Sequence, residues 1–245
     1  MFESTTGVAT LTVTGTDFED NYSAGRGGAI WLACVDATIT GDSDGTWDSY
    51  LDGSSSTFWS NYGENGGAIY LYGDGYDDNE CPDGTQGSLT VEGVVFDDNE
   101  ADYQGGAIHT QQTDVALDYI DISNSVFYSN YADGSGGAIN SDNVDVTIDH
   151  SLFLSNYTDS DGGALEVSGA DWDLEITDSD FTDNQAWEDG GGAIKNSGMW
   201  GMTISDTLFQ GNGADEDGGA ILRYEGSYDT DLISNSDFID NSSGQ

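Results

Sequence analysis

The chain has 245 residues, with 47 Asp and Glu against 3 Lys and Arg, which gives a formal net charge of −44. Such a surface repels nucleic acid and anionic lipid, which proteins bind mainly through Lys and Arg, so we expect no nucleic-acid partner. No stretch approaches the roughly 20 apolar residues of a transmembrane helix, so we expect no direct insertion into a membrane.

Two short sequence motifs alternate along the whole chain. Phe-x-x-Asn occurs eight times and Gly-Gly-Ala-Ile, once with Leu in place of Ile, occurs seven times. A fixed internal period of this kind indicates a repeat architecture. The Gly pairs begin at Gly27, Gly66, Gly105, Gly136, Gly162, Gly191 and Gly218. The Phe-x-x-Asn motifs are Phe18 with Asn21, Phe58 with Asn61, Phe96 with Asn99, Phe127 with Asn130, Phe153 with Asn156, Phe181 with Asn184, Phe209 with Asn212 and Phe238 with Asn241.

Each repeat predicts three short strands joined by turns. The first strand is an alternating apolar pair before the Phe, the second begins at the Phe, and the third begins at Gly-Gly-Ala-Ile. We therefore predict an all-β parallel β-helix of about eight rungs, one domain over residues 1–245, because each repeat buries its apolar side against its neighbours. The alternating pairs are Leu11 with Val13, Leu89 with Val91, Ile120 with Ile122, Val146 with Ile148, Leu174 with Ile176 and Met202 with Ile204.

Stacking assigns a structural role to every motif position. The Phe residues would form an inward aromatic ladder. Each Asn would sit at a corner, where its amide can bond the turn backbone and the same Asn of the next rung. The Gly pair permits close backbone approach. We therefore expect these residues to be scaffold and not an active site.

The alternation of Gly-Gly-Ala-Ile with Phe-x-x-Asn resembles the signature of the polymorphic outer membrane protein repeats of chlamydial autotransporter passengers. The resemblance extends from Phe18 to Asn241. It implies a right-handed parallel β-helix, extracellular or on a cell surface, commonly acting as an adhesin. Compared with the chlamydial pattern, residues 1–245 include no recognisable translocator barrel or signal and are far more acidic.

Two insertions interrupt the repeat, at residues 41–53 and 73–87. Their Asp-rich turns resemble Ca²⁺ loops, where alternate carboxylates turn inward, although neither completes an EF-hand. The alternative is a solvated acidic turn. Cys34 and Cys81 flank the insertions and predict either a disulfide or two free thiols. The candidate ligands are Asp42, Asp44 and Asp48 in the first insertion and Asp74, Asp77, Asp78 and Asp83 in the second.

A further acidic cluster lies just before several Gly pairs. Stacking would align these residues along one edge of the rod, where they either hold Ca²⁺ or extend into salt water, as in a halophilic protein. Candidate metal ligands on this edge are Asp159, Asp161, Asp215 and Asp217, and their acidic neighbours are Asp133, Glu188, Asp189 and Glu216.

The basic and imidazole residues do not suggest an enzyme. Arg26, Lys195 and Arg223 are far apart in the repeat, and His109 and His150 belong to different strands. A polysaccharide lyase needs a base at its site, and a carboxylate pair suited to a glycosidase occurs by chance among 47 acids. We therefore expect a non-enzymatic protein, with a polysaccharide-active enzyme as the less favoured alternative.

Function is expected on the surfaces that the repeat leaves free. Six tryptophans exceed what the Phe ladder uses, and they could stack on sugars or pack beneath loops. We predict adhesion to a cell-surface or glycan ligand. No polar cap is evident at either end, so we expect either a segment of a longer passenger or rods that stack end to end. The alternative to an adhesin is therefore a filament or surface-layer subunit that self-associates end to end. The tryptophans are Trp31, Trp47, Trp59, Trp172, Trp187 and Trp200.

Overall fold

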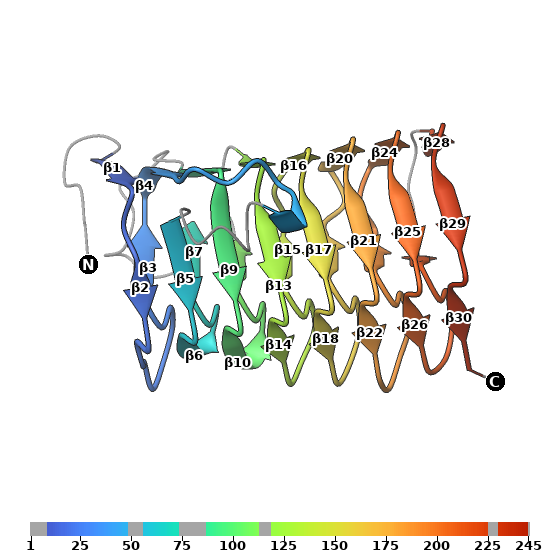
Figure 1. The fold of residues 1–245 in the computed structure, drawn as a ribbon, viewed down its shortest axis with the longest axis horizontal. Helices are drawn as coiled ribbons and strands as arrows, with labels where there is room; N and C mark the ends of the chain where they lie inside the picture. Colours follow the sequence, from blue (N-terminus) through green and yellow to red (C-terminus); the bar gives the residue numbers. More distant parts are fainter. Residues whose placement is uncertain (1–8, 49–55, 74–86, 113–118, 225–229, 245) are drawn as a thin grey trace.

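Four parallel sheets run side by side along a rod, and the chain visits them in the same order in every turn (Figure 1). The structure, a computed structural model, describes residues 9–48, 56–73, 87–112, 119–224 and 230–244. We name the sheets A, B, C and D in the order in which each turn passes through them. The predicted all-β parallel β-solenoid is confirmed, with eight strands in sheets A and B and seven in sheets C and D.

Sheets A and B carry the first two strands of each turn. Sheet A consists of β1 (Ala9–Thr14), β4 (Val35–Thr40), β8 (Ser88–Glu92), β12 (Ile120–Ser123), β16 (Val146–Asp149), β20 (Asp173–Thr177), β24 (Gly201–Ser205) and β28 (Leu232–Ser234). Sheet B consists of β2 (Phe18–Glu19), β5 (Ser56–Trp59), β9 (Val94–Asp97), β13 (Val126–Tyr128), β17 (Leu152–Leu154), β21 (Asp180–Thr182), β25 (Leu208–Gln210) and β29 (Asp237–Ile239).

Sheets C and D complete the turn. Sheet C consists of β6 (Tyr62–Asn65), β10 (Glu100–Gln104), β14 (Tyr131–Ala132), β18 (Tyr157–Thr158), β22 (Gln185–Ala186), β26 (Gly213–Ala214) and β30 (Ser242–Ser243). Sheet D consists of β3 (Ile30–Ala33), β7 (Ile69–Gly73), β11 (Ile108–Gln112), β15 (Ile139–Asp142), β19 (Leu165–Ser168), β23 (Ile194–Ser197) and β27 (Ile221–Tyr224).

The prediction of three strands per rung is wrong, because sheet C adds a fourth. Its strands follow directly after the Asn of Phe-x-x-Asn, where the sequence suggested only a corner. Most of them are two residues long, as in β14 and β18. Two residues are too few to show the period-two alternation by which a strand is recognised in a sequence.

The Phe residues form the inward ladder, in register from turn to turn. Adjacent rings, such as Phe127 and Phe153, stack with centroids 4.6 Å apart and planes within 2°. The rings from Phe58 to Phe209 are fully buried in one apolar core, which also contains the Ile or Leu of the first six Gly-Gly-Ala-Ile motifs, while Ile221 of the last motif is partly buried against it. The fold therefore buries the repeated apolar residues and places function on the outer faces of the sheets.

The Asn residues form a second ladder at the corner between sheets B and C. The Nδ2 of Asn156 donates to Oδ1 of Asn184 at 3.0 Å and to the carbonyl of Phe127 at 2.9 Å. The backbone N–H of Asn156 donates to the same Oδ1 at 3.0 Å. Each buried amide therefore joins three consecutive turns and leaves the corner without an unsatisfied polar group.

The amide ladder runs the length of the rod without a break. In every turn but the last, Nδ2 of the motif Asn donates to Oδ1 of the Asn in the next turn, at 2.8–3.0 Å. The inner amides are buried, whereas the first and last are partly exposed. The ladder comprises Asn21, Asn61, Asn99, Asn130, Asn156, Asn184, Asn212 and Asn241.

The Gly pair turns the chain into sheet D where no side chain fits. The first glycine has a positive φ, +70° at Gly136. A Cβ on the second glycine, Gly137, would lie 2.1 Å from the carbonyl oxygen of Gly163 in the next turn. Close stacking of the turns therefore requires glycine at both positions.

Cys34 lies between β3 and β4 and is disulfide-bonded. Its predicted partner, Cys81, lies outside the described residues. Cys34 thus lies at the first connection from sheet D to sheet A, with a φ of +55°.

Candidate functional site

The residue before each Gly pair forms a straight column along the corner between sheets C and D. The first glycine of each pair donates its N–H to the carbonyl of the column residue in the next turn, as from Gly136 to Asp161 at 2.9 Å and from Gly191 to Asp217 at 2.9 Å. We call this set the corner column; its members are Arg26, Asn65, Gln104, Ser135, Asp161, Gly190 and Asp217.

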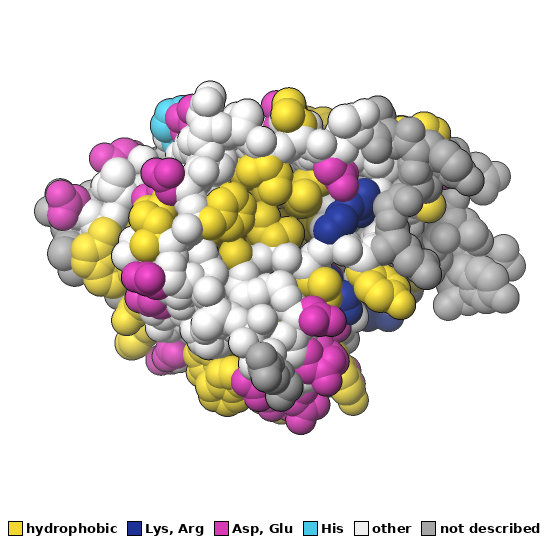
Figure 2. Space-filling model, turned by 90° about the vertical axis from the view of Figure 1, so that its right-hand side faces the viewer, with side chains coloured by type: hydrophobic (Ala, Val, Ile, Leu, Met, Phe, Trp, Pro, Cys, Tyr) yellow, Lys and Arg dark blue, Asp and Glu magenta, His cyan; other side chains and the backbone are white. Residues whose placement is uncertain are grey.

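The acidic edge expected from the sequence lies along this column and forms a wall of a pocket of about 380 Å³. Figure 2 shows acidic side chains gathered at one edge of the C-terminal end of the rod, close to basic side chains. Of the candidate metal ligands on the edge, Asp161 and Asp217 line the pocket, whereas Asp159 and Asp215 do not. The corner contributes Asp161, Asp189, Gly190, Glu216 and Asp217, and sheet D contributes Lys195, Ser197, Leu222 and Tyr224.

Lys195 supplies a positive charge to this pocket. Its ammonium group pairs with Asp161 and lies 3.7 Å from Oε1 of Glu166, and its side chain is 19% exposed. Partial burial opposes the charged form, but Asp161, Glu166 and Asp189 outweigh it and raise the pKa of Lys195. The ammonium therefore stays charged and neutralises part of the acidic edge.

Glu166 is a largely buried carboxyl beside the pocket, with a side chain that is 14% exposed. Burial raises its pKa to about 7, although Lys195 and a hydrogen bond from Ser135 act in the opposite direction. Nδ2 of Asn140, its neighbour in the register of sheet D, donates to Oε2 at 2.7 Å. Glu166 is therefore the acid in this group whose charge changes near neutral pH.

The outer face of sheet C carries aromatic rings stacked from turn to turn. Tyr22 stacks on Tyr62 with ring centroids 5.2 Å apart. Further along, Tyr157 stacks between Tyr131 at 4.7 Å and Trp187 at 5.5 Å. Tyr22 is 72% exposed and Trp187 is 51% exposed. We call these five residues the aromatic row.

Carboxylates hold the tyrosines of the aromatic row in place. The hydroxyl of Tyr62 donates to Asp102, and this hydrogen bond is the main cause that raises the pKa of Tyr62 to about 12. The hydroxyl of Tyr131 donates to Asp159 at 3.0 Å, and burial with hydrogen bonds to Asp133 and Asp159 raises the pKa of Tyr131. Asp159, a candidate metal ligand, therefore acts as the acceptor for a phenol.

The six tryptophans divide between the two expected roles. Trp59, Trp187 and Trp200 are exposed. Trp47 and Trp172 pack against buried apolar residues, and the buried Nε1 of Trp31 has no hydrogen-bond partner. Trp187 alone of the exposed three stacks on another ring of the described residues.

The described part of the first insertion, residues 41–48, forms a strap across the outer surface. Figure 1 shows it in blue, running from β4 along the rod toward β17. Gly45 lies so close to the backbone of His150 that an added Cβ would meet the His150 carbonyl oxygen at 1.9 Å. Trp47 packs on Val95, Val126 and Leu152 of sheet B. The insertion therefore crosses three turns that are distant in sequence.

The structure does not gather the acidic residues of the first insertion around one point. Oδ1 of Asp44 accepts hydrogen bonds from the N–H of Thr46 at 3.1 Å and from its hydroxyl at 2.6 Å, so this carboxylate holds a turn. Within the described ranges, Asp42, Asp44 and Asp48 do not bring three ligand atoms within 4.8 Å of one another. The candidates in the second insertion, Asp74, Asp77, Asp78 and Asp83, lie outside the described residues.

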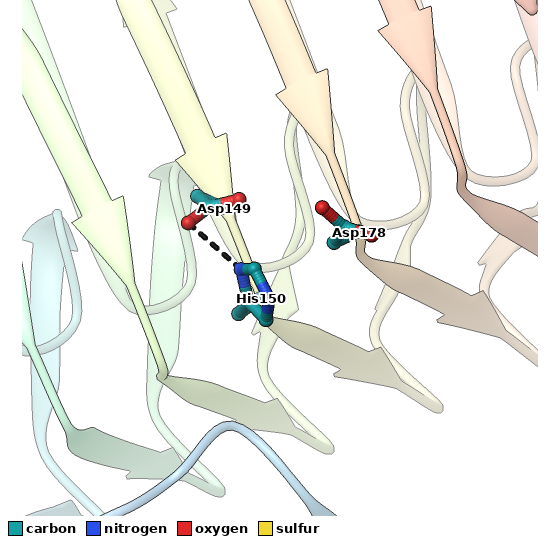
Figure 3. Close-up of side chains that lie close together, drawn as sticks. All are labelled: Asp149, His150 and Asp178. Carbon is teal, nitrogen blue, oxygen red and sulfur yellow. Dashed lines mark ion pairs between the residues drawn. The ribbon is translucent and has the colours of Figure 1, made fainter.

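One mixed group of possible metal ligands does come together, at the corner between sheets A and B. Asp149, His150 and Asp178 each offer an atom within 4.8 Å of the others, and Figure 3 shows His150 between the two carboxylates. Nδ1 of His150 lies 2.8 Å from Oδ2 of Asp149, and this hydrogen bond is the main cause that raises the pKa of His150. Sequence reasoning missed the group, although His150 and Asp178 are 28 residues apart, the repeat length.

His109, read from the sequence as a strand residue, lies within β11. Burial lowers its pKa to about 4, so the ring is neutral at physiological pH. Its Nδ1 has no hydrogen-bond partner. In the neighbouring turn of sheet D, the Tyr70 ring lies 5.3 Å away and also contacts Arg26, whose guanidinium is 5.0 Å from the ring centroid.

Among the residues that the structure describes, no helix has the length and apolar character needed to span a membrane.

Four segments match the family described as Chlamydia polymorphic membrane protein repeat: residues 15–33, 93–111, 124–142 and 206–222. Each segment contains one Phe-x-x-Asn and the Gly-Gly-Ala-Ile that follows it. No curated protein and no solved structure matches the chain.

Proposed function

Because the chain carries repeats of the Chlamydia polymorphic membrane protein type, we propose that it is a non-enzymatic cell-surface protein that binds glycans through the outer face of sheet C. Proteins with this repeat are surface proteins, which supports an extracellular location. The repeated residues are used in the core and corners, so binding has to involve residues outside the motifs.

The aromatic row carries this proposal. Stacked rings cover one another's faces, but a ring at the end of a stack has one face without a ring partner. Trp187 is such a ring. The pairing of Ala186 with Ala214 places Asp215 at the equivalent position of the next turn, so no ring covers Trp187 on that side. An exposed indole face with carboxylates nearby can stack on the apolar face of a sugar while the carboxylates accept its hydroxyl hydrogens.

Binding to a printed array of neutral and uronate-containing oligosaccharides tests this function. We expect neutral sugars to be preferred, because a net charge of −44 repels uronates. Trp187→Ala should weaken binding by about fivefold, the loss of roughly 1 kcal/mol of stacking. Trp59→Ala removes an exposed indole from a different face, that of sheet B, and should leave binding unchanged. Equal losses in both variants, or no binding to any sugar, would reject the proposal.

End-to-end self-association is a second candidate function, favoured by the last turn. Phe238 stacks on Phe209 on one side and is 47% exposed, beside exposed Leu232, Ile233 and Ile239. A second copy stacked on this end would bury these side chains and pair the strand edges of the last turn. Sedimentation at rising protein concentration distinguishes the two candidates, since a filament subunit should associate and Phe238→Ser should prevent it.

A further inference from the structure

The corner column and the outer face of sheet D contact two cations of this chain. In the first turns, the guanidinium of Arg26, a corner-column residue, lies 5.0 Å from the ring centroid of Tyr70 and 5.2 Å from that of Tyr72. Five turns further along, the ammonium of Lys195 pairs with Asp161 and Glu166. Along this side of the rod, positive charge is therefore held at one place by aromatic faces and at another by carboxylates.

The last turns offer both kinds of group that contact those cations, an aromatic ring and carboxylates. Tyr224 occupies the position in its strand of sheet D that Tyr72 occupies near the start of the rod, three residues after the motif Ile. Ser197 is the residue at this position in the preceding turn. The corner-column position that Arg26 occupies at the start of the rod is held here by Asp217. An aromatic ring is therefore again present, but the corner offers a carboxylate in place of a guanidinium.

The carboxylates of the pocket exceed the positive charge available to them. Asp161 pairs with Lys195. Asp189, Glu216 and Asp217 also line the pocket, and among the described residues Lys195 is the one cationic side chain that does so. Three carboxylates are left to attract positive charge from outside the chain.

We infer that this pocket binds an arginine or lysine side chain of a partner protein. The cationic head would lie over Tyr224, which is 60% exposed, and be attracted by Glu216 and Asp217. The aliphatic stem would pack on Leu222. A Ca²⁺ ion, which takes oxygen ligands, would make no use of Leu222 or the tyrosine ring. The inference goes beyond the proposed function, because it concerns a different face of the rod and a different class of ligand.

Fluorescence anisotropy with a labelled glycine-serine peptide that carries two adjacent arginines tests the inference. A peptide with citrulline in place of arginine keeps the shape and removes the charge. At about 0.15 M salt, where distant charges are screened, the arginine peptide should bind and the citrulline peptide should bind about tenfold more weakly or not at all. The measurement involves no sugar, so it can fail or succeed independently of the glycan test.

Matched variants separate this pocket from the general negative field. Glu216→Gln with Asp217→Asn should weaken binding about fivefold or more. Asp121→Asn with Glu175→Gln, which removes the same charge from sheet A, should change it less than about twofold. Tyr224→Ala should weaken binding about threefold, and Tyr224→Phe should not. Equal losses in the two double variants, or equal binding of the citrulline peptide, would overturn the inference. Far-ultraviolet circular dichroism checks that each variant is folded.

Discussion

At the scale of single residues, each motif position satisfies a requirement of stacked turns. The Asn156 amide bonds both neighbouring turns, and Gly137 leaves room for the carbonyl of the next turn. Outside the motifs, residues at one position change from turn to turn, as Asn140, Glu166 and Lys195 do in register on sheet D. The scaffold is therefore repeated, while the chemistry of the outer face is set residue by residue.

Glu166 makes stability depend on pH in a defined window. Its pKa is raised from 4.5 to about 7 in the folded state, so the folded protein binds the proton more tightly than the unfolded chain. This contribution to stability is complete below about pH 4.5 and is lost as the pH rises through about 7. Glu166→Gln has no carboxyl to titrate, so it does not lose this stability as the pH rises. The free energy of unfolding of the variant, relative to that of the wild type, should therefore increase by about 2–3 kcal/mol between pH 4.5 and 7.5.

Urea unfolding of both proteins across this pH range measures that difference. Other carboxylates titrate in both proteins and cancel in the subtraction. A difference that stays constant with pH would show that folding does not raise the pKa of Glu166.

At the scale of elements, the strap of residues 41–48 shows how an insertion uses the regular surface. The sequence suggested a Ca²⁺ loop because carboxylates and glycines alternate there. In the structure the carboxylate of Asp44 holds a turn, and Trp47 reaches an apolar patch on sheet B formed by Val95, Val126 and Leu152. The Trp47 ring also meets Tyr128 edge to face at 5.1 Å and 70°. Hydrophobic contact is therefore what fastens the described part of this insertion.

Trp47→Ala should release the strap from sheet B. The substitution removes apolar contact with three side chains, which we expect to lower the free energy of unfolding by about 1–3 kcal/mol. Hydrogen exchange of the amides at residues 43–47 should become faster, as measured by mass spectrometry.

Trp59→Ala is the matched control for the strap, because Trp59 is an exposed indole on the same sheet and outside the apolar patch. Trp59→Ala should change neither the free energy of unfolding nor the exchange rate of the amides at residues 43–47. Unchanged exchange in Trp47→Ala would show that other contacts hold the strap.

At the scale of the whole molecule, a net charge of −44 acts on every turn. Self-repulsion destabilises a compact chain of this charge, and added ions reduce it either by screening or by binding at specific sites. The pairing of Lys195 with Asp161 shows one place where the acidic edge is neutralised by the chain itself. Ions from solution can neutralise much of the remaining charge, so we propose Ca²⁺ as a stabilising ligand of the acidic clusters outside the Lys195 pocket.

Thermal melts in micromolar Ca²⁺, in EDTA and in molar KCl test that proposal. Specific sites predict that the melting temperature rises by several degrees in Ca²⁺ and falls back in EDTA, because a bound ion stabilises the folded state by mass action. Asp149→Asn with Asp178→Asn removes two carboxylates of the mixed ligand group and shows whether that group contributes. Stabilisation by molar KCl alone would indicate screening and exclude specific Ca²⁺ sites.

The sequence by itself determined the repeat, the parallel solenoid and the inward direction of the Phe residues, because each depends on a pattern that recurs at one period. It also placed Asp161 and Asp217 on one edge, since residues at equivalent repeat positions stack. Sheet C was not foreseen, because strands such as β14 and β18 are too short to show a pattern.

Only the tertiary structure decided what each outer face contains. The pairing of Lys195 with Asp161, the meeting of His150 with Asp178 and the docking of Trp47 all join different turns. Such contacts depend on where side chains and a non-repeating strap reach after the turns have stacked. A periodic sequence fixes which residues share a column, but burial and side-chain reach decide which of them form a site.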